Sequence, residues 1–282
     1  MLRIVTDGAV DMPSAWFETY GINRIPINVH FGEEKTFLQD VELSLEGFYN
    51  LVDGKSLPHP KTSQPSPHQF VEYYKQIAQP GDTILSIHIT SKLSGTYASA
   101  VAAAEEVKGT FNVIPVDTLC GSMGTGFMCR SARLMERAGK SVDEIVRYIE
   151  SVRAKTQVIL TLDTLDYARR SGRVGTLSAA LASVLNVKPI ALLQDGIVNM
   201  VDKVRTRKAA LERVLDMAKQ AYGDQPVFLG VVHARDLASG QAMLEEAKKR
   251  LNVKESFLTD LSISLAINFG PGTVGVVLYP VE

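Results

Sequence analysis

Short apolar runs alternate with longer amphipathic stretches over the first half of the chain. The runs are rich in Ile, Val and Leu and have the length of buried strands, while the stretches carry helix start signals. Strand, turn and helix in repeating order are typical of a parallel α/β sheet. We therefore expect strands at 2–6, 25–31, 83–88 and 112–117, and helices at 12–20, 45–52, 67–77, 95–104, 121–138 and 142–155.

Three of these helix starts carry recognisable caps. Capping boxes, in which a serine and a Gln or Glu three residues later satisfy each other's backbone N–H groups, stand at 66–69 and 141–144. Asp11 is expected to cap the first helix. The proline-containing stretch at 61–67 is expected to be a polar loop, which leaves two hydroxyl residues on that loop, Thr62 and Ser63.

The pattern changes near Thr156, where antiparallel signals begin. Asp195-Gly196 between two apolar runs is a strong signal for a two-residue hairpin. Residues 1–155 are expected to form a three-layer α/β/α domain with a mainly parallel sheet, and residues 156–282 an α/β domain with a mixed or antiparallel sheet. The second domain's expected strands are 157–162, 189–193, 197–204, 227–233, 256–261 and 273–279, and its helices are 164–175, 177–185, 208–222 and 238–251.

Composition narrows the class of protein. Hydrophobic residues make up 45% and charged residues 22% of the 282 positions, which is typical of a globular protein. The formal net charge of −1 does not favour nucleic acid as a partner. No apolar run reaches the ~20 residues of a membrane span, so we expect a cytoplasmic protein without stable membrane insertion, which is compatible with transient membrane contact. Cys120 and Cys129 are expected to be free thiols.

The turn after the strand at 83–88 is the first candidate for chemistry. Ser94, Gly95 and Thr96 stand where the next helix is expected to begin. The first N–H groups of a helix lack partners and carry about half a positive charge, so such a turn suits a ligand with a negatively charged oxygen. Alternatively, Ser94 serves only as the helix N-cap, and the residues by themselves leave both interpretations open.

Other polar groups are expected at the same edge of the sheet. Thr62, Ser63 and the turn at 268–272, which begins with Asn268, present hydroxyls and amides where ligands of open α/β folds bind. Behind them, residues 98–104 and 177–185 carry Ala and Ser where a tighter core would have Leu. The missing volume fits either a tunnel for an apolar tail or closer packing of helices on the sheet.

Common catalytic and metal-binding signatures are absent from the sequence. There is no G-x-S-x-G or H-E-x-x-H motif, and the five histidines show no metal-ligand spacing. The glycines at 121, 124 and 126 fit phosphate contact or close helix packing, and their spacing is the reverse of the dinucleotide fingerprint. Clustered arginines form either a solvated face or a site for a phosphate or an acidic partner: Arg169, Arg170, Arg173, Arg205 and Arg207.

Seven short motifs, in order along nearly the whole chain, resemble those of the DegV family of bacterial fatty-acid-binding proteins. They are DGAVD at 7–11, KTSQPS at 61–66, SKLSGTY at 91–97, VDT at 116–118, SGRV at 171–174, KVRTR at 203–207 and GPGTVG at 270–275. Several motifs in the right order are far more specific than any one of them.

The resemblance implies a two-domain protein that holds one long-chain fatty acid in a tunnel between its domains, with no other cofactor, no metal and no catalytic residue of its own. It implies that a fatty acid kinase is the partner, which phosphorylates the presented carboxyl group to an acyl phosphate for phospholipid synthesis. The basic surface for this kinase would include Arg173 and Arg205. The resemblance implies that Thr62 and Ser94, with neighbouring turn amides, hold the carboxylate. Together with the polar groups at the same sheet edge, the expected carboxylate-binding residues are Thr62, Ser63, Ser94, Gly95 and Asn268.

The sequence departs from the family pattern at two positions, and two other functions remain as hypotheses. Asn268-Phe269 stands where the family commonly has His-Thr or His-Val, and Asn donates a hydrogen bond but cannot titrate. Gly8 stands where the family usually has Ser. The alternative function is a hydrolase or phosphotransferase with Ser94 as nucleophile, which the lack of a histidine beside a nucleophile motif disfavours. Nucleotide binding at 121–126 is the third hypothesis.

Overall fold

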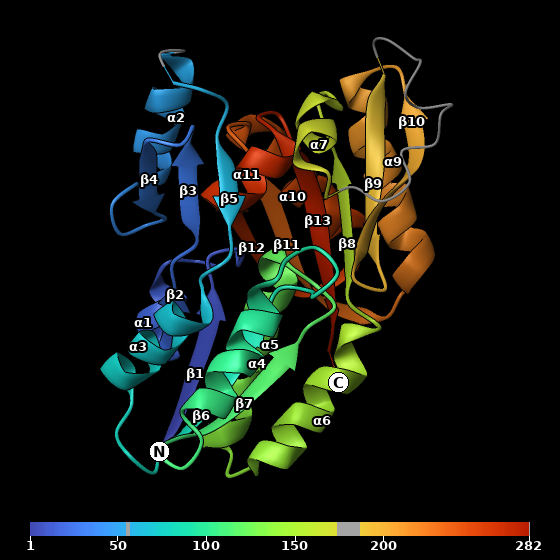
Figure 1. Cartoon of the computed structure of the whole chain (residues 1–282). Helices are drawn as coiled ribbons and strands as arrows, with labels where there is room; N and C mark the ends of the chain where they lie inside the picture. Colours follow the sequence, from blue (N-terminus) through green and yellow to red (C-terminus); the bar gives the residue numbers. More distant parts are fainter. Residues whose placement is uncertain (55–56, 174–186, 282) are drawn as a thin grey trace.

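The computed structural model describes residues 1–54, 57–173 and 187–281. Within these residues the fold is mixed α/β, as the sequence predicts, and it contains a parallel sheet, a mixed sheet and a small antiparallel sheet (Figure 1). The expected helix at 177–185 lies outside the described residues.

The parallel sheet belongs to the first half of the chain. Helices α3 (Pro67–Ile77) and α4 (Thr96–Glu106) pack on one face, and α1 (Ala15–Thr19), α5 (Ser122–Arg137) and α6 (Val142–Arg153) pack on the other, which gives the expected three layers. The four strands run in the spatial order β2 (Ile22–Ile25), β1 (Leu2–Asp7), β6 (Thr83–His88) and β7 (Asn112–Asp117). The carboxyl ends of β1, β6 and β7 therefore meet at one edge, where ligands of such sheets bind.

The mixed sheet belongs to the second half. Helices α9 (Arg207–Tyr222) and α10 (Leu237–Arg250) cover one of its faces, and α5 from the first half lies against the other. A short helix, α7 (Asp166–Ser171), follows its first strand. The six strands have the order β10 (Ile197–Val204), β9 (Lys188–Gln194), β8 (Gln157–Thr161), β13 (Val274–Pro280), β11 (Pro226–His233) and β12 (Asn252–Asp260).

Helix α5 lies between the two large sheets, and this position explains its glycines. Its first half is buried on all sides, and the ring of Phe127 lies 5.3 Å from that of Tyr279 in β13. A Cβ atom at Gly126 would stand 3.2 Å from the carbonyl oxygen of Asp11. Of the two interpretations of these glycines, the structure supports close packing.

A third, antiparallel sheet was not expected. It consists of β4 (Lys35–Leu38), β3 (Asn28–Phe31) and β5 (Lys61–Ser63), with α2 (Leu45–Asp53) beside it. The sheet and α2 share one apolar cluster with α11 (Ile263–Phe269) from the second half, in which Phe31 and Phe48 are joined by Ile263 and Ile267. The domain boundary at residue 155 stays a prediction, since two apolar clusters contain residues from both sides of it.

Several local predictions are confirmed. Both capping boxes form, and the hairpin between β9 and β10 turns through Asp195 and Gly196 with φ angles of 50° and 77°, as a two-residue turn of the primed type requires. Cys120 and Cys129 are free and buried. No helix among the described residues has the length and apolar character to cross a bilayer.

Four local predictions are wrong. The expected strand 25–31 is split between two sheets, because β2 ends at Ile25 before Pro26 and β3 begins at Asn28. Thr62 and Ser63 lie in strand β5 rather than in a loop, and Asn268 lies in helix α11 rather than in a turn. Asp11 does not cap the first helix, which begins at Ala15 after Ser14.

Candidate ligand-binding site

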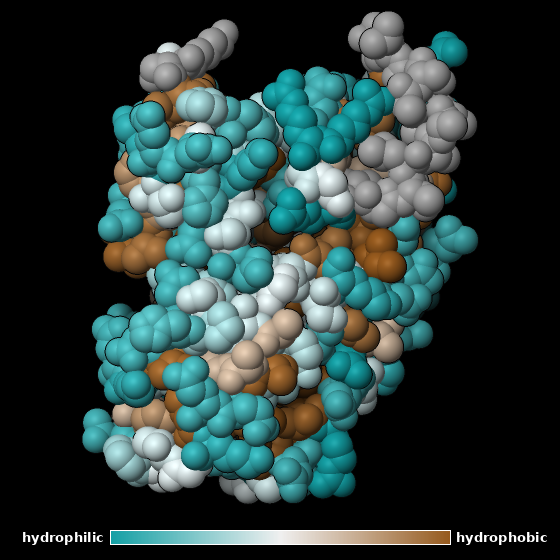
Figure 2. Space-filling view, viewed as in Figure 1, coloured by the Kyte–Doolittle hydropathy of each residue, from teal (hydrophilic) through white to brown (hydrophobic). Residues whose placement is uncertain are grey.

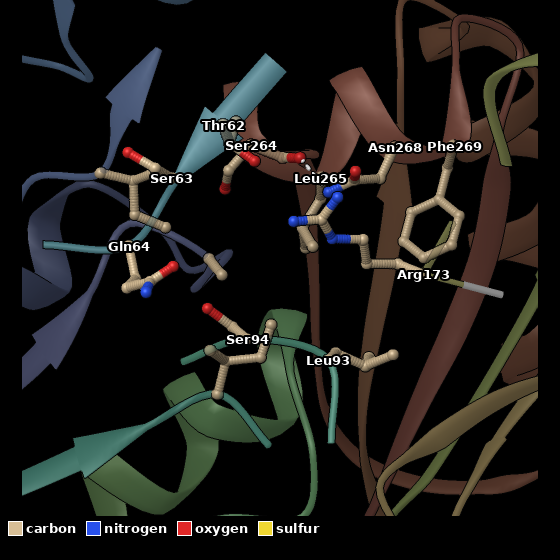
Figure 3. A pocket seen from close by; sticks show the side chains of 13 residues that line it. Thr62, Ser63, Gln64, Leu93, Ser94, Arg173, Ser264, Leu265, Asn268 and Phe269 are labelled. Atoms are coloured by element: carbon tan, nitrogen blue, oxygen red, sulfur yellow. Dashed lines mark hydrogen bonds between the residues drawn. The ribbon is translucent and has the colours of Figure 1, made fainter. Parts of the chain in front are cut away.

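A polar pocket lies where segments from both halves of the chain meet (Figure 3). Strand β5 and the residue after it form one side, the turn after β6 forms the floor, and helix α11 forms the opposite side. Figure 2 shows apolar surface bordering a hollow on this face, below the hydrophilic side chains around α7. The lining residues are Ala9, Ile27, Thr62, Ser63, Gln64, Ile89, Leu93, Ser94, Arg173, Ser264, Leu265, Asn268 and Phe269.

The two hydroxyl residues of β5 have different roles. Thr62 lines the pocket, and among the described residues no hydrogen-bond partner is found for its hydroxyl. The Ser63 hydroxyl is 2.8 Å from Nε2 of His30, whose Nδ1 atom is 2.8 Å from Oγ1 of Thr36. Ser63 thus lines the pocket with its hydroxyl already bonded to a neighbouring strand.

Ser94 combines the two roles that the sequence left open. Its hydroxyl oxygen accepts a hydrogen bond from the backbone N–H of Thr96 at 3.3 Å and is 2.8 Å from the Thr96 hydroxyl, so it stabilises the start of α4. The same side chain lines the pocket. Gly95 is the N-cap of α4, and a Cβ atom there would stand 2.8 Å from Nε2 of Gln64, so this glycine lets Gln64 approach.

Helix α11 brings a second set of polar groups. Asn268 donates from Nδ2 to the carbonyl oxygen of Ser264 at 2.7 Å, so one of its amide hydrogens is used within its own helix. The Ser264 hydroxyl donates to the carbonyl oxygen of Gly8 at 3.1 Å, and Gln39 donates to the same oxygen at 2.7 Å. The backbone N–H of Ser264 donates to Oε1 of Gln39 at 3.1 Å. These bonds fasten α11 to the turn after β1.

The two arginines expected on a partner surface lie in different places. Arg173 is exposed and also lines the pocket, with its guanidinium on the α11 side (Figure 3). Its Nη1 atom donates to the carbonyl oxygen of Ser171 at 2.6 Å. Arg205 is exposed just before α9 and is not among the lining residues. The structure therefore brings Thr62, Ser63, Ser94, Asn268 and Arg173 together and leaves Gly95 and Arg205 outside the lining.

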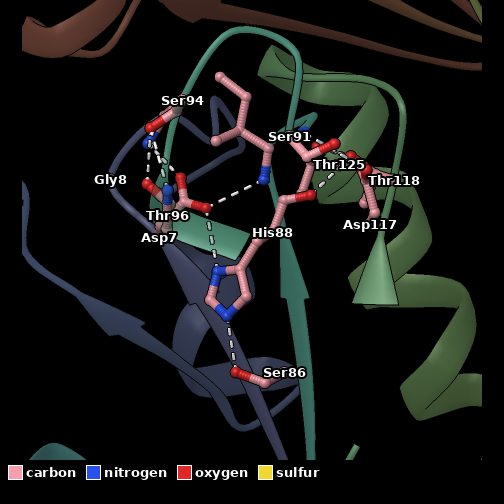
Figure 4. Close-up of polar contacts among 12 residues, drawn as sticks. Asp7, Gly8, Ser86, His88, Ser91, Ser94, Thr96, Asp117, Thr118 and Thr125 are labelled. Atoms are coloured by element: carbon pink, nitrogen blue, oxygen red, sulfur yellow. Dashed lines mark hydrogen bonds and ion pairs between the residues drawn. The ribbon is translucent and has the colours of Figure 1, made fainter. Parts of the chain in front are cut away.

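A buried hydrogen-bonded chain holds the turns at the floor of the pocket (Figure 4). Asp7 accepts bonds from the backbone N–H groups of Ala9, at 2.9 Å, and Ile89, at 3.0 Å, and both residues line the pocket. His88 Nδ1 is 3.0 Å from the same carboxylate, and its Nε2 is 2.6 Å from the Ser86 hydroxyl. The chain ends 2.8 Å further on at the hydroxyl of Tyr74, whose pKa burial raises.

An apolar cavity adjoins the polar pocket. The two share Ile89, Leu93, Leu265 and Phe269, so a polar space and an apolar space lie side by side. Their volumes are about 50 and about 30 Å³. The other residues of the apolar cavity come from β8, β9 and β10, from the start of α5 with its N-cap, and from the position after β12. They are Gly121, Ser122, Val158, Leu160, Ala191, Leu193, Val198 and Leu261.

Sequence reasoning missed several lining residues. Gln64 and Leu93 lie inside two of the quoted motifs, and Phe269 adjoins Asn268, so their place in those motifs was the available signal. Ser264 had no such signal, because the short helix that carries it was not predicted. The described residues contain no group of three or more His, Cys, Asp or Glu side chains able to hold a metal ion.

Comparison with known proteins decides the family. The family model described as "Uncharacterised protein, DegV family" matches residues 1–281. This chain belongs to the DegV family. A DegV domain-containing protein of Deinococcus radiodurans is 35% identical over 100% of this chain and 99% of its own length. Protein DegV of Bacillus subtilis is 28% identical over 98% of each chain.

Solved DegV-family structures share the whole fold. A DegV family protein from Thermus thermophilus, described as binding fatty acid, is 30% identical, covers 99% of each chain and has a TM-score of 0.90. A Thermotoga maritima protein whose structure is described as revealing fatty acid binding function is 26% identical, covers 99% of each chain and has a TM-score of 0.87. The resemblance seen in the motifs is thus confirmed at the level of family and fold.

Proposed function

We propose that this DegV-family protein binds one long-chain fatty acid, with its carboxylate in the polar pocket and its tail in the apolar cavity. One observation carries the proposal: the two spaces share four lining residues and differ in chemistry at their ends. A molecule with a small polar head and a long apolar tail matches this division. The fatty acid binding described for the Thermus and Thermotoga relatives supports the same ligand class.

The head-group contacts would come mainly from uncharged donors. The Thr62 hydroxyl, which has no hydrogen-bond partner among the described residues, and the Ser94 hydroxyl line the pocket from β5 and from the turn before α4. A hydroxyl donates one hydrogen bond, and a carboxylate accepts several. Asn268 retains one amide hydrogen beyond the one it gives to Ser264. These groups orient the head, and the exposed Arg173 supplies the positive charge nearby.

The tail would supply most of the binding free energy. Each buried methylene contributes about 0.8 kcal/mol, so a C16 chain gains more than about 10 kcal/mol before ordering costs. The two cavities, at about 50 and 30 Å³, are small beside such a chain. The proposal therefore includes movement of lining side chains when the ligand enters.

The finer proposal is that the bound carboxylate is presented to a fatty acid kinase. Arg173 at the pocket edge and Arg205 on the exposed surface suit a partner with acidic groups, and Arg173 is close enough to the head group to link docking with access. The protein itself would supply no catalysis. Acyl phosphate formation by an added bacterial fatty acid kinase, measured with and without this carrier, tests the partnership.

The alternative, a hydrolase with Ser94 as nucleophile, lacks a base in the described pocket. The lining residues include no histidine, and the Ser94 hydroxyl is bonded to Thr96. The buried His88 is engaged by Asp7 and Ser86. Nothing in this geometry activates the serine.

Denaturing mass spectrometry of the purified protein tests the proposed function. A co-purified fatty acid at about one per chain is the expected result. A lipid-free protein that does not take up added palmitate would contradict the carrier, and turnover of an ester by that protein would support the hydrolase instead. A Ser94→Ala variant separates these outcomes further, because it abolishes hydrolysis but only weakens binding.

A further inference from the structure

An outer groove adjoins the apolar cavity. It has a volume of about 550 Å³ and lies between the connection that follows β1 and the end of β12. Leu261 lines both the cavity and the groove, and only 1% of its surface is exposed. Leu261 therefore lies at the boundary between the two spaces.

A set of hydrogen bonds also links the lining of the cavity with the lining of the groove. Ser122, which lines the cavity, donates its hydroxyl hydrogen to Oδ2 of Asp11 at 2.5 Å. Asp11 lines the groove, and its other oxygen accepts from the backbone N–H of Ser262 at 2.7 Å. We name these four residues the partition: Asp11, Ser122, Leu261 and Ser262.

Within the partition, Leu261 is the residue that faces both the cavity and the groove. Leu261 lines the apolar cavity but is not among the residues around Thr62 and Ser94. Its backbone N–H donates to the carbonyl oxygen of His233 at 2.7 Å, which fixes it at the end of β12. The groove beyond it is partly apolar, with Val10, Met12, Phe17, Leu45, Leu258 and Ile263 in its lining.

We propose that Leu261 determines acyl-chain length by closing the cavity against the outer groove. The inference rests on the proposed function and places the methyl end of the bound chain against this side chain. Each methylene of the ligand that is buried before the chain reaches Leu261 raises the affinity about fourfold, and a methylene beyond that point adds nothing. With a shorter side chain at position 261, a longer acyl chain passes into the groove and gains contact with its apolar lining.

Competition between two saturated acids, palmitate (C16) and behenate (C22), tests the role of Leu261. Delipidated protein is loaded with an equimolar mixture, and the bound acids are counted by mass spectrometry. In Leu261→Ala the bound C22 to C16 ratio is expected to rise about tenfold, the effect of one or two extra buried methylenes. Leu258→Ala is the matched control, because Leu258 lines the groove alone, and its ratio is expected to equal that of the wild type.

The wild-type arm separates the two proposals. Wild-type protein that loads neither acid contradicts fatty acid binding itself. Wild-type protein that loads C16, together with a Leu261→Ala variant whose C22 to C16 ratio is unchanged, overturns the role of Leu261 and leaves the proposed function standing. Leu261→Val removes a single methylene and is expected to shift the ratio in the same direction by less, so it carries the test if the alanine variant does not fold.

Discussion

Asp11 is a fully buried carboxyl group whose hydrogen-bond donors, Ser122 and Ser262, are uncharged. Burial raises its pKa from 3.8 to about 6, because the ionised form loses its hydration and the two hydrogen bonds restore only part of it. Nearby Asp260 adds repulsion. The folded protein therefore holds a proton on Asp11 more readily than the unfolded chain does.

This shift predicts a pH dependence of stability. Between pH 3.8 and about 6 the folded state binds a proton that the unfolded state has released, so this group's contribution to the free energy of unfolding falls as the pH rises. The contribution is fully present below pH 3.8 and lost above about 6. The total change is on the order of 3 kcal/mol.

Asp11→Asn removes the titration and keeps the shape of the side chain. Urea unfolding at several pH values measures the free energy of unfolding of both proteins. From pH 4 to pH 7 we expect the wild type to lose stability relative to the variant. Asn still accepts from Ser262, and the Ser122 hydroxyl can turn to accept from its amide. Parallel pH profiles for the two proteins would contradict the buried titration.

Thr62 and Ser94 can be tested as the carboxylate donors. Thr62→Ala combined with Ser94→Ala is expected to weaken palmitate binding by about 1–3 kcal/mol, since a buried carboxylate would lose two hydrogen-bond donors. Ser63→Ala is the comparison variant, because the Ser63 hydroxyl already lies 2.8 Å from Nε2 of His30 and is expected to contribute less to the carboxylate. Equal affinity of the double variant and the wild type in a lipid-exchange assay would remove both residues from the site.

At the scale of elements, the sequence predicts best where local chemistry decides. The capping boxes at Ser66 and Ser141 and the hairpin at Asp195 depend on side chains and φ angles within a few residues, and all are confirmed. The prediction of a single strand from Ile25 to Phe31 was wrong. Apolar and polar residues do alternate over this stretch, but it is divided between two sheets at Pro26. Only the tertiary structure separates the two strands.

The candidate site was predicted in part for the same reason. The fold brings together Thr62, Ser63 and Ser94, which belong to two of the motifs. Arg173 was expected on a surface for a partner, and it also lines the pocket. Helix α11 is too short to give a periodic signal, so the contribution of Ser264 was invisible before the fold was known. Proximity across a tertiary interface is not encoded in any local pattern.

The chain Asp7–His88–Ser86–Tyr74 links strands to the turns that follow them, and it predicts unequal effects along its length. His88→Phe leaves the buried Asp7 carboxylate without its Nδ1 partner, and we expect a loss of about 3 kcal/mol in the free energy of unfolding. Tyr74→Phe removes only the last hydroxyl, and about 1 kcal/mol is expected. Urea unfolding measures the loss of free energy of unfolding in both variants. Equal losses would show that the bond from His88 does not stabilise the buried Asp7 side chain.

At the scale of the whole molecule, the pocket is built from distant parts of the chain. Thr62 and Ser94 come from the first half, and Asn268 and Phe269 come from the second. Helix α5 already packs between the two large sheets, so the halves contact each other without ligand. A bound fatty acid would add further contacts across the same junction.

Ligand removal should therefore lower the thermal stability of the entire chain in one transition. At a free ligand concentration of about 100 times Kd, binding stabilises the native state by about 2.7 kcal/mol, which corresponds to a Tm increase of roughly 5–10 °C for a chain of this size. Calorimetry of delipidated protein, before and after reloading with palmitate, measures the shift, and decanol serves as the control for an apolar tail without a carboxylate. Because the site joins both halves, the whole transition should move; a shift confined to part of the unfolding signal would place the ligand within one half only.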